Sequence, residues 1–371
     1  MTRMAVVDSV RASDGAPASR VALLKVTLRL LVSAALLAFL VTKIPSGSLE
    51  PKDTHAGTLL FFFAALGLTF AGFVLSAWRW QRVLAVFDVH VELRTLLSHY
   101  LAGQFVGNLL PSTIGGDVLR VSRSSKRVGG DVAFASVAIE RLTGFVALPL
   151  LTVIGFVVKP SLLELPHAWV AVVISAVTVA ALLVIVFVAG HPDLAGRFER
   201  HENWMRFIGA VHTGVVRLHR EPRRGVGVLA AAVAYQASVV AAVWCAVHAL
   251  GVSVPDGAVI AFIPAVAMAQ VLPISLGGLG IREGLLVLLL HPLGVPTGKA
   301  IGVGLLWYGM TLLVSLLGAP AFAVGHRHGR HGRRGHDSTE PDDEACKLAR
   351  SGDATSDSPT ADSHTGGAPL R

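Results

Sequence analysis

The sequence predicts an all-α protein that crosses a membrane several times and is built from two inverted halves. Hydrophobic residues make up 53% of the 371 residues, and charged residues only 15%. Soluble domains carry about 25% charged residues, so this composition is typical of an integral membrane protein. A short polar break at the end of an apolar run returns later in the chain in altered form. These observations together predict a helical bundle with an internal repeat.

Charge and cysteine usage narrow the functional classes. The net charge of +8 could suggest a nucleic-acid partner, but the arginines flank apolar segments. Membrane topology explains that pattern better, and no nucleic-acid partner is expected. The two cysteines are Cys245, inside an apolar run, and Cys346, in a polar tail. They predict neither a disulfide framework nor a metal site, and no cofactor is expected.

The first part of the chain predicts two membrane helices. Residues 1–20 are polar and precede an apolar run over about residues 26–41. No small-residue cleavage site follows, so we expect a retained helix with its N-terminus in the cytoplasm. The second helix is predicted over about 57–77, ending at Trp78-Arg79-Trp80. Tryptophan beside arginine is typical of a cytoplasmic membrane interface.

The polar break follows in the stretch Asn108-Leu-Leu-Pro-Ser-Thr-Ile-Gly-Gly-Asp-Val-Leu-Arg120. The apolar segment 95–110 before it is shorter than the ~20 residues that a crossing needs. Basic residues flank the segment on both sides. Since basic residues favour the cytoplasmic side, the pattern predicts a re-entrant hairpin that enters from the cytoplasm and returns there.

Further crossings are predicted at about 132–158, 167–190 and 225–250. Between the last two, segment 191–224 is rich in arginine and is expected in the cytoplasm. Within it, apolar residues from Trp204 to Leu218 recur at helical spacing. This helix could lie in the headgroup layer or pack on the protein's own cytoplasmic face.

The second break is Gln270-Val-Leu-Pro-Ile-Ser-Leu-Gly-Gly-Leu-Gly-Ile-Arg282, followed by Glu283. The apolar segment 258–272 leads into it, and segment 284–291 is too short to cross. These two pieces predict a second re-entrant hairpin, entered from outside. A last crossing at about 298–324 ends in arginines, which predicts a cytoplasmic C-terminus.

The two breaks share one register. Pro111, Gly115, Gly116 and Arg120 correspond to Pro273, Gly277, Gly278 and Arg282, an offset of 162 residues (282 minus 120). An odd number of crossings lies between the breaks, so the second copy is inverted. Each half therefore reads as helix, helix, re-entrant hairpin, helix. Such inverted repeats with broken helices are typical of transporters, whose substrates bind at the breaks.

The predicted domain organisation has three parts. Residues 1–20 form a cytoplasmic polar N-terminus and residues 326–371 a disordered cytoplasmic tail, which lacks apolar periodicity. The transmembrane domain covers 21–325, with halves at about 21–158 and 167–325.

Polar groups in apolar surroundings indicate the candidate site. Helices that restart after paired glycines present unpaired N–H groups that favour an anion such as a lipid phosphate. Arg120 and Arg282 can add bidentate hydrogen bonds to phosphate. Tyr100, Gln104 and Asn108 recur every four residues as one polar stripe, which faces either a pathway or another helix.

Some of these residues have structural alternatives. Asp117 could cap a helix, bind a cationic group of the headgroup or pair with Arg120, and Glu140 and Arg141 could form a structural ion pair that locks a hairpin. The predicted substrate-binding residues, with no catalytic residue among them, are Asn108, Pro111, Gly115, Gly116, Asp117, Arg120, Glu140, Arg141, Gln270, Pro273, Gly277, Gly278, Arg282 and Glu283.

Four motifs together resemble a known family. They are Trp78-Arg79-Trp80, Asn108-Leu-Leu-Pro-x-x-x-Gly-Gly-Asp-x-x-Arg120, Glu140-Arg141-x-x-Gly144 and Gly277-Gly-Leu-Gly-x-Arg-Glu283. This set is similar to the lysylphosphatidylglycerol synthase transmembrane family, the flippase-like domain also found at the N-terminus of the bacterial multiple peptide resistance factor. The resemblance covers about residues 20–325.

The resemblance implies movement of a membrane lipid between the leaflets of a bacterial plasma membrane. Candidate substrates are an aminoacylated phosphatidylglycerol or a glycolipid or polyprenyl-phosphate-linked lipid. The resistance factor also carries a soluble domain that transfers lysine, which this chain lacks, so we expect a transporter and not an enzyme. A separate lipid-synthesising enzyme would then be a partner. The alternatives are a lipid headgroup transferase with Glu140 or Asp117 as general base, or a scaffold that recruits a synthase through 191–224.

Overall fold

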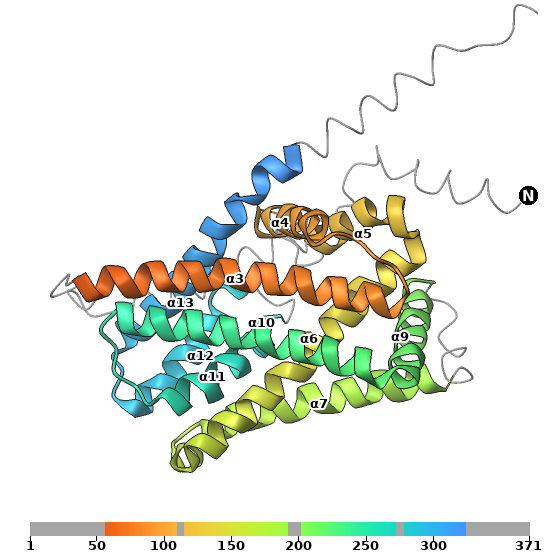
Figure 1. Cartoon of the computed structure of the whole chain (residues 1–371). Coiled ribbons are helices and arrows are strands. Elements are labelled where there is room, and N and C mark those ends of the chain that lie inside the picture. Colours follow the sequence, from red (N-terminus) through yellow and green to blue (C-terminus); the bar gives the residue numbers. More distant parts are fainter. Residues whose placement is uncertain (1–55, 110–114, 192–201, 272–277, 324–371) are drawn as a thin grey trace, which may run out of the picture. The chain divides into compact units, whose positions relative to one another are not determined.

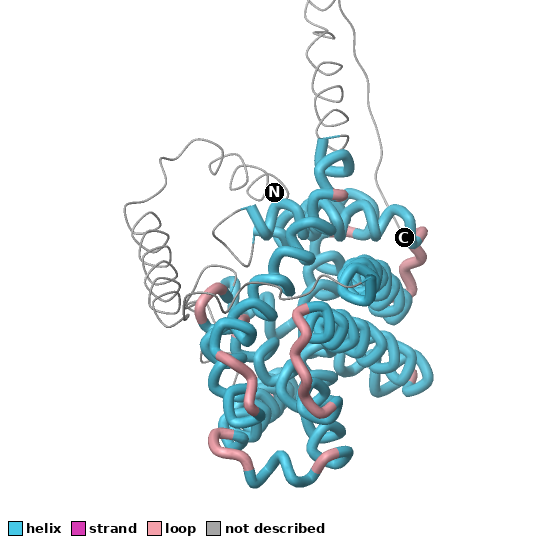
Figure 2. Tube along the Cα trace, turned by 90° about the vertical axis from the view of Figure 1, so that its left-hand side faces the viewer, coloured by secondary structure: helices cyan, strands magenta, loops and turns pink. Residues whose placement is uncertain are grey.

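The computed structural model describes residues 56–109, 115–191, 202–271 and 278–323. Throughout these ranges the chain forms helices joined by short loops, without any strand (Figure 2). This confirms the all-α prediction for the described part of the chain. The predicted first helix at 26–41 and the predicted tail at 326–371 lie outside the described residues.

Ten α-helices and two short 3₁₀ helices follow one another in the described ranges (Figure 1). Their bounds are α3 Ala56–Val86, α4 Leu93–Leu109, α5 Gly115–Val128, α6 Gly130–Val158, η1 Pro160–Glu164, α7 Ala168–Gly190, α9 Glu202–Arg220, α10 Pro222–Ala249, α11 Asp256–Ala269, α12 Ile281–Leu290, η3 His291–Leu293 and α13 Thr297–Leu316. Residues 318–323 are also helical.

Five of the described helices, α3, α6, α7, α10 and α13, are long and apolar enough to cross a membrane. They correspond to the crossings predicted from the sequence. The predicted end of the second helix near residue 77 is wrong, because α3 continues to Val86. Trp80 is fully buried and Arg79 is only 5% exposed. The Trp-Arg-Trp segment therefore lies inside the bundle rather than at an exposed helix end.

The long helices enclose a shorter one. Helices α3 and α10 pack along each other through much of their length (Figure 1). Helix α11 is buried almost throughout, from Gly257 to Ala269, against α6, α7 and α10. Because Gly155 of α6 has no side chain, the two backbones can approach closely there; a Cβ atom at this position would overlap Ala261. Such contacts between small residues are typical of packing between membrane helices.

Helices α4 and α5 pack against each other as a hairpin. Glycines form their crossing point, since a Cβ atom on Gly116 would overlap the backbone carbonyl of Gly103. Helices α11 and α12 are also in contact and form the second pair. Both breaks, at 110–114 and 272–277, lie outside the described residues. The inverted repeat and the re-entry of the hairpins into a membrane stay predictions.

Helix α9 packs on α6 and α7. Val211 is fully buried and clusters with Ala189 of α7, while Gly214 lies directly against Ile139 of α6. The Nδ1 atom of His212 lies 2.7 Å from the carbonyl oxygen of Ala189. Of the two alternatives left open by the sequence, the structure therefore shows a helix packed on the protein itself.

Asp88, in the turn after α3, connects this helix to the arginine-rich segment. Its carboxylate accepts hydrogen bonds from Arg224 at 2.8 Å and from Arg217 at 3.3 Å. The hydrogen bond from Arg224 holds the pKa of Asp88 below its usual range. The same two guanidinium groups donate to the carbonyl groups of Ala85 and Val86. They thereby satisfy acceptors at the end of α3 that have no partner within the helix.

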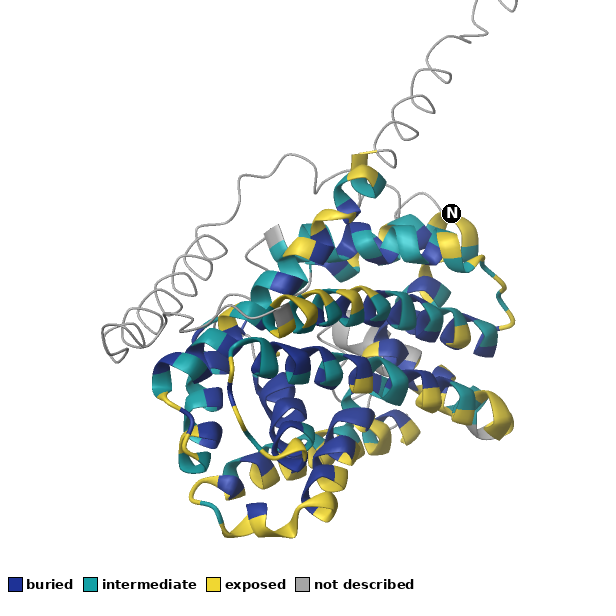
Figure 3. Cartoon of the chain, turned by 60° about the vertical axis from the view of Figure 1, so that its left-hand side comes forward, coloured by how far each residue is buried: buried dark blue, intermediate teal, exposed yellow. Residues whose placement is uncertain are grey.

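Most helices carry buried residues along one side and exposed residues along the other (Figure 3). On α7 the exposed side is strongly apolar and includes Trp169, Leu183 and Phe187. In water such a surface would be costly, whereas lipid chains solvate it. The exposed apolar surface therefore agrees with a multi-pass membrane protein.

Cysteine labelling tests the predicted orientation. In a background with Cys245→Ala and Cys346→Ser, the exposed Ser122 in α5 and Thr213 in α9 are replaced individually by cysteine. Both should react with an impermeant maleimide only from the cytoplasmic side, whereas Ser253→Cys in the loop before α11 should react from outside. Reaction of the residue-122 cysteine from outside would contradict the predicted re-entrant hairpin and the inverted repeat that depends on it.

Candidate functional site

The buried carboxylate of Glu140 on α6 connects three helices through ion pairs and hydrogen bonds. Its Oε1 atom accepts hydrogen bonds from Arg79 Nη2 of α3 at 2.5 Å and from Ser76 Oγ at 3.0 Å. Its Oε2 atom accepts one from Arg120 Nη2 of α5 at 2.5 Å. The residue is only 1% exposed. One carboxylate therefore compensates two buried guanidinium groups and connects α3, α5 and α6.

Aromatic rings hold the two arginines in place. The Arg120 guanidinium lies 4.3 Å from the ring centroid of Trp80 and 4.8 Å from that of Tyr100. Arg79 lies 4.8 Å from the ring centroid of Tyr235 on α10. At these distances the negative face of an aromatic ring attracts a cation. The rings thus orient the guanidinium planes and stabilise charges that would be costly to bury.

Gly144 provides the space that Arg79 needs. It lies one turn after Glu140 on α6, and a Cβ atom there would be 2.8 Å from Arg79 Nη1. A side chain at this position would push the guanidinium away from Glu140. This explains the glycine in the motif Glu140-Arg141-x-x-Gly144.

A second ion pair joins Arg141 to the hairpin. Its Nε atom donates a short hydrogen bond to Asp117 of α5, and the other oxygen of Asp117 lies 3.5 Å from Arg120 Nη1. Asp117 thus pairs with Arg120, one of the alternatives proposed from the sequence, and also with Arg141. Glu140 and Arg141 pair with Arg120 and Asp117 of α5 and not with each other, so both form ion pairs that hold the hairpin on α6, as the structural alternative predicts.

The second hairpin carries a similar cluster. Arg282 donates from Nε and Nη2 to Glu283 Oε1, at 3.0 and 2.9 Å. Its guanidinium lies 5.7 Å from the ring centroid of Trp307 and 5.0 Å from that of Tyr308, both on α13. The backbone N–H of Gly280 donates to Glu283 Oε2 at 2.6 Å. Glu283 therefore occupies the start of α12, where the sequence predicted free N–H groups.

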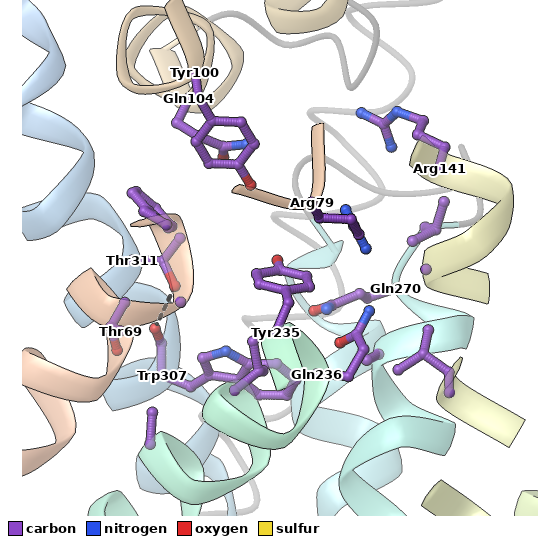
Figure 4. Close-up of a pocket in the computed structure, with 18 of the residues that line it drawn as sticks. Thr69, Arg79, Tyr100, Gln104, Arg141, Tyr235, Gln236, Gln270, Trp307 and Thr311 are labelled. Atoms are coloured by element: carbon purple, nitrogen blue, oxygen red, sulfur yellow. Dashed lines mark hydrogen bonds between the residues drawn. The ribbon is translucent and has the colours of Figure 1, made fainter. Parts of the chain in front are cut away.

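The clusters surround one cavity of about 310 Å³. In Figure 4, Arg79 lies between Tyr100 and Gln104 on one side and Tyr235 and Gln236 on the other, with Arg141 on α6 facing the same space. The residues with polar groups that line this cavity are Thr69, Arg79, Tyr100, Gln104, Asn108, Arg120, Glu140, Arg141, Tyr235, Gln236, Gln270, Arg282, Trp307, Tyr308 and Thr311.

Four buried nitrogen atoms of residues that line the cavity have no hydrogen-bond partner among the described residues. They are Nε and Nη1 of Arg79, Nε of Arg120 and Nδ2 of Asn108. Buried polar groups are nearly always hydrogen-bonded, because an unpaired one costs free energy. All four atoms are donors, so the group that satisfies them must be an acceptor, and beside two guanidinium groups an anion fits best.

The structure brings most of the predicted site residues together. Asn108, Arg120, Glu140, Arg141, Gln270 and Arg282 line the cavity. Asp117 and Glu283 lie directly behind it as partners of these arginines. Gly115 and Gly116 form the first turn of α5, and Gly278, with φ +78°, packs on Gln270. Pro111, Pro273 and Gly277 lie outside the described residues.

Local geometry differs between the two breaks. Helix α5 begins at Gly115 itself, so Arg120 lies in its second turn. Helix α12 begins later relative to its glycines, at Ile281, which places Arg282 in the first turn. The positive φ angles of Gly278 and Gly280 extend the turn and delay the second helix. The two arginines therefore reach the same cavity from different helical positions.

Several residues that line the cavity are not among those predicted from the sequence. Tryptophans flank Arg79 in the sequence, a pattern that predicts an interfacial residue and not a buried one. Tyr235 and Gln236 lie within the apolar run of α10, and Trp307 and Tyr308 within that of α13. Polar side chains inside a predicted crossing are a usable signal, because they are costly when they face lipid.

The fold and the cavity together define an α-helical, multi-pass membrane protein with a buried polar site between its helices. The chain matches the family described as Lysylphosphatidylglycerol synthase TM region over residues 26–318. It therefore belongs to this family, as the four motifs predicted. No curated protein matches the chain.

Replacing Glu140 by Gln tests the central ion-pair cluster. The variant keeps the size of the side chain but leaves two buried guanidinium groups without their shared counter-charge. We expect the free energy of unfolding to fall by roughly 3–5 kcal/mol, measured by thermal melting in detergent. As a control, Glu221→Gln removes a partner of Arg224 in an exposed pair and should change the melting temperature little. Similar melting curves for the two variants would contradict the role assigned to Glu140.

Proposed function

We propose that this protein binds the phosphate-containing headgroup of a membrane lipid in the central cavity and moves the lipid between leaflets. The observation that carries this proposal is the set of buried, unpartnered donors of Arg79, Arg120 and Asn108, three residues that line the cavity. A phosphate offers several acceptor oxygens and matches the geometry of guanidinium groups. The family to which the chain belongs and the apolar helices around the cavity support a lipid as the source of that phosphate.

The charge around the cavity favours an anion. Among the described residues, the guanidinium groups of Arg79, Arg120, Arg141 and Arg282 face the carboxylates of Glu140, Asp117 and Glu283. Four positive charges against three negative charges leave one positive charge uncompensated. Since the surroundings are apolar, a bound anion would relieve this imbalance with little competition from water.

The cavity volume suits a headgroup and not a whole lipid. Small-molecule sites typically measure about 300–1,000 Å³, and this cavity of about 310 Å³ is near the lower limit. Acyl chains would have to remain in the bilayer while the headgroup passes through the protein. Each half of the predicted inverted repeat would then contribute one hairpin to the path, which is the arrangement that supports alternating access.

The same arginines that face the cavity also hold the first hairpin. Arg120 of α5 reaches Glu140 of α6, and Asp117 of α5 pairs with Arg141 of α6. A phosphate bound to the free donors of Arg79 and Arg120 adds negative charge beside Glu140 and shares the positive charge that now attracts this carboxylate. Binding therefore weakens the attachment of the hairpin to α6 and favours its movement. A ligand shifts the equilibrium between two conformations toward the one that it binds more tightly.

The transferase alternative receives less support from the geometry. A general base must accept a proton from its substrate, so its carboxylate oxygens need to be accessible. Glu140 is bound by two arginines and is 1% exposed, and Asp117 is bound by Arg120 and Arg141. We therefore propose a transporter without catalytic activity, located in the bacterial plasma membrane with both termini in the cytoplasm and served by a separate lipid-synthesising enzyme.

The lipid profile of a deletion strain separates these functions. If the protein is a transporter, total lipid composition should stay unchanged while the distribution between leaflets shifts. Disappearance of a lipid species from the whole cell would contradict transport and indicate synthesis or recruitment of a synthase.

Lysine substitutions test the arginine site. Arg120→Lys and Arg282→Lys keep the charge but lose the planar fork, so lipid transport in proteoliposomes should fall while membrane insertion is preserved. Alanine at either position should cost more, since a charge-assisted contact is worth roughly 1.5–3 kcal/mol, about tenfold or more in affinity. Arg127→Lys, on the exposed part of the same helix as Arg120, is the matched control and should transport normally.

A purely structural role for Arg282 makes a different prediction. If Arg282 only holds its hairpin through Glu283, Arg282→Ala should lower the melting temperature, and removing Glu283 as well should restore part of it. Full transport by both Arg120→Ala and Arg282→Ala would exclude the phosphate site.

Gly144→Ala tests the position of Arg79 without touching a charge. The added methyl group would displace the Arg79 guanidinium, and we expect transport to fall by about tenfold or more, because small displacements of binding groups have large effects. Gly209→Ala on α9 adds the same methyl group into open space and should leave the transport rate unchanged. Equal transport by the two variants would show that the position of Arg79 does not matter.

A further inference from the structure

We infer that residues 318–323, the latch segment, hold the α4–α5 hairpin in its observed position and limit the rate at which the hairpin moves. The segment is helical and follows α13 after one turn residue, Leu317, at the blue end of the described chain (Figure 1). The inference rests on the proposed function, because it concerns the control of the hairpin that carries Arg120. It is independent of which lipid the cavity binds.

Arg123 of α5 attaches the hairpin to the latch segment. Its Nη1 atom donates a hydrogen bond to the carbonyl oxygen of Ala321, and its Nη2 atom donates one to that of Phe322, both at 3.0 Å. Hydrogen bonds from a charged donor are stronger than those between neutral groups. The guanidinium also lies 5.6 Å from the ring centroid of Phe322, within the range of a cation–π contact. One side chain therefore makes three contacts with the latch segment.

Helix α4 packs on the latch segment as well. Gly318 lies directly against Leu101, since a Cβ atom on this glycine would be 2.1 Å from the Leu101 carbonyl oxygen. The rings of Phe105 and Phe322 have their centroids 6.1 Å apart, as in other aromatic pairs. The latch segment thus contacts both helices of the hairpin.

Helix α4 lies between the latch segment and the cavity. Tyr100 and Gln104 line the cavity, whereas Leu101 and Phe105, the residues that follow them, contact the latch segment. Consecutive residues of an α-helix point roughly 100° apart, so the two sets lie on different faces of α4. A movement of α4 at the cavity therefore changes its packing on the latch segment, unless the segment moves with it.

The latch contacts are separate from the ion pairs that hold the hairpin on α6. Those ion pairs use Arg120 and Asp117, and their charges are at the cavity. Arg123 is not among the described residues that line the cavity. A phosphate in the cavity consequently acts on the first attachment and leaves the second one intact. Release of the latch segment is therefore a further step that must follow headgroup binding before the hairpin can move.

A reversible cross-link between the hairpin and the latch segment tests the inference. In the full-length protein with Cys245→Ala and Cys346→Ser, the substitutions Phe105→Cys and Phe322→Cys are joined by a short bismaleimide that contains a disulfide. Proteoliposomes that contain phosphatidylglycerol and lysylphosphatidylglycerol are then followed by leaflet-resolved lipid analysis. We expect the cross-link to abolish transport and reduction of the linker to restore it. The two single-cysteine variants, treated in the same way, should transport normally.

The outcomes separate this inference from the proposed function. Unchanged transport by the fully cross-linked protein would overturn the inference and leave the proposed function intact, because the latch segment would then move together with the hairpin. If neither lipid is transported by the wild-type protein, the proposed function fails and the inference fails with it.

Replacing Arg123 by Gln should release the hairpin more easily. The variant loses the charged hydrogen bonds to the latch segment, so the maximal transport rate should rise about threefold to tenfold. The lipid concentration at half-maximal rate should change little, because Arg123 does not line the cavity. Arg127→Gln, on the exposed part of the same helix, is the matched control and should transport like the wild type.

Gly318→Ala tests the same attachment from the other helix. The added methyl group would overlap the Leu101 carbonyl and displace the latch segment from α4, so transport should again be faster than in the wild type. Gly309→Ala in α13 adds a methyl group into open space and should leave the rate unchanged. Unchanged or slower transport by both Arg123→Gln and Gly318→Ala, with melting temperatures like that of the wild type, would contradict a restraining latch.

Discussion

The shared carboxylate of Glu140 is the interaction on which the site depends. Two arginines from different helices are buried beside it, and neither would be tolerated in an apolar bundle without a counter-charge. By binding one Nη atom of each, Glu140 holds α3 and the α4–α5 hairpin on α6. The Glu140 carboxylate therefore determines both the position of the hairpin and the charge of the cavity.

The way in which Glu140 is bound also explains why the site can accept a ligand. The carboxylate occupies Nη2 of Arg79 and Nη2 of Arg120, which leaves Nε and Nη1 of Arg79 and Nε of Arg120 without partners. Arg282 repeats the design on the second hairpin, with Glu283 as counter-charge and two aromatic rings of α13 nearby. Both hairpins thus bring to one cavity an arginine whose charge a carboxylate compensates, and Arg120 keeps a buried donor without a partner among the described residues.

Most of the helices could be predicted because apolar runs and basic flanks are local properties of the sequence. The partners of the charged residues could not, because they are separated by many residues in the chain. Glu140 and Arg141 suggested an ion pair by their proximity in sequence, yet adjacent residues point to different sides of a helix and bind different partners. Arg79 illustrates a different difficulty: tryptophan beside arginine is typical of a membrane interface, but here the rings are packed against buried charges.

A structure of the protein in a lipid nanodisc that contains phosphatidylglycerol tests the central claim most directly. We predict a phosphate group in the cavity within hydrogen-bonding distance of Nε of Arg79 and Nε of Arg120, with its acyl chains extending into the bilayer. A cavity that contains only water, with lipid phosphates restricted to the two surfaces of the membrane, would contradict the claim that these arginines bind a lipid headgroup.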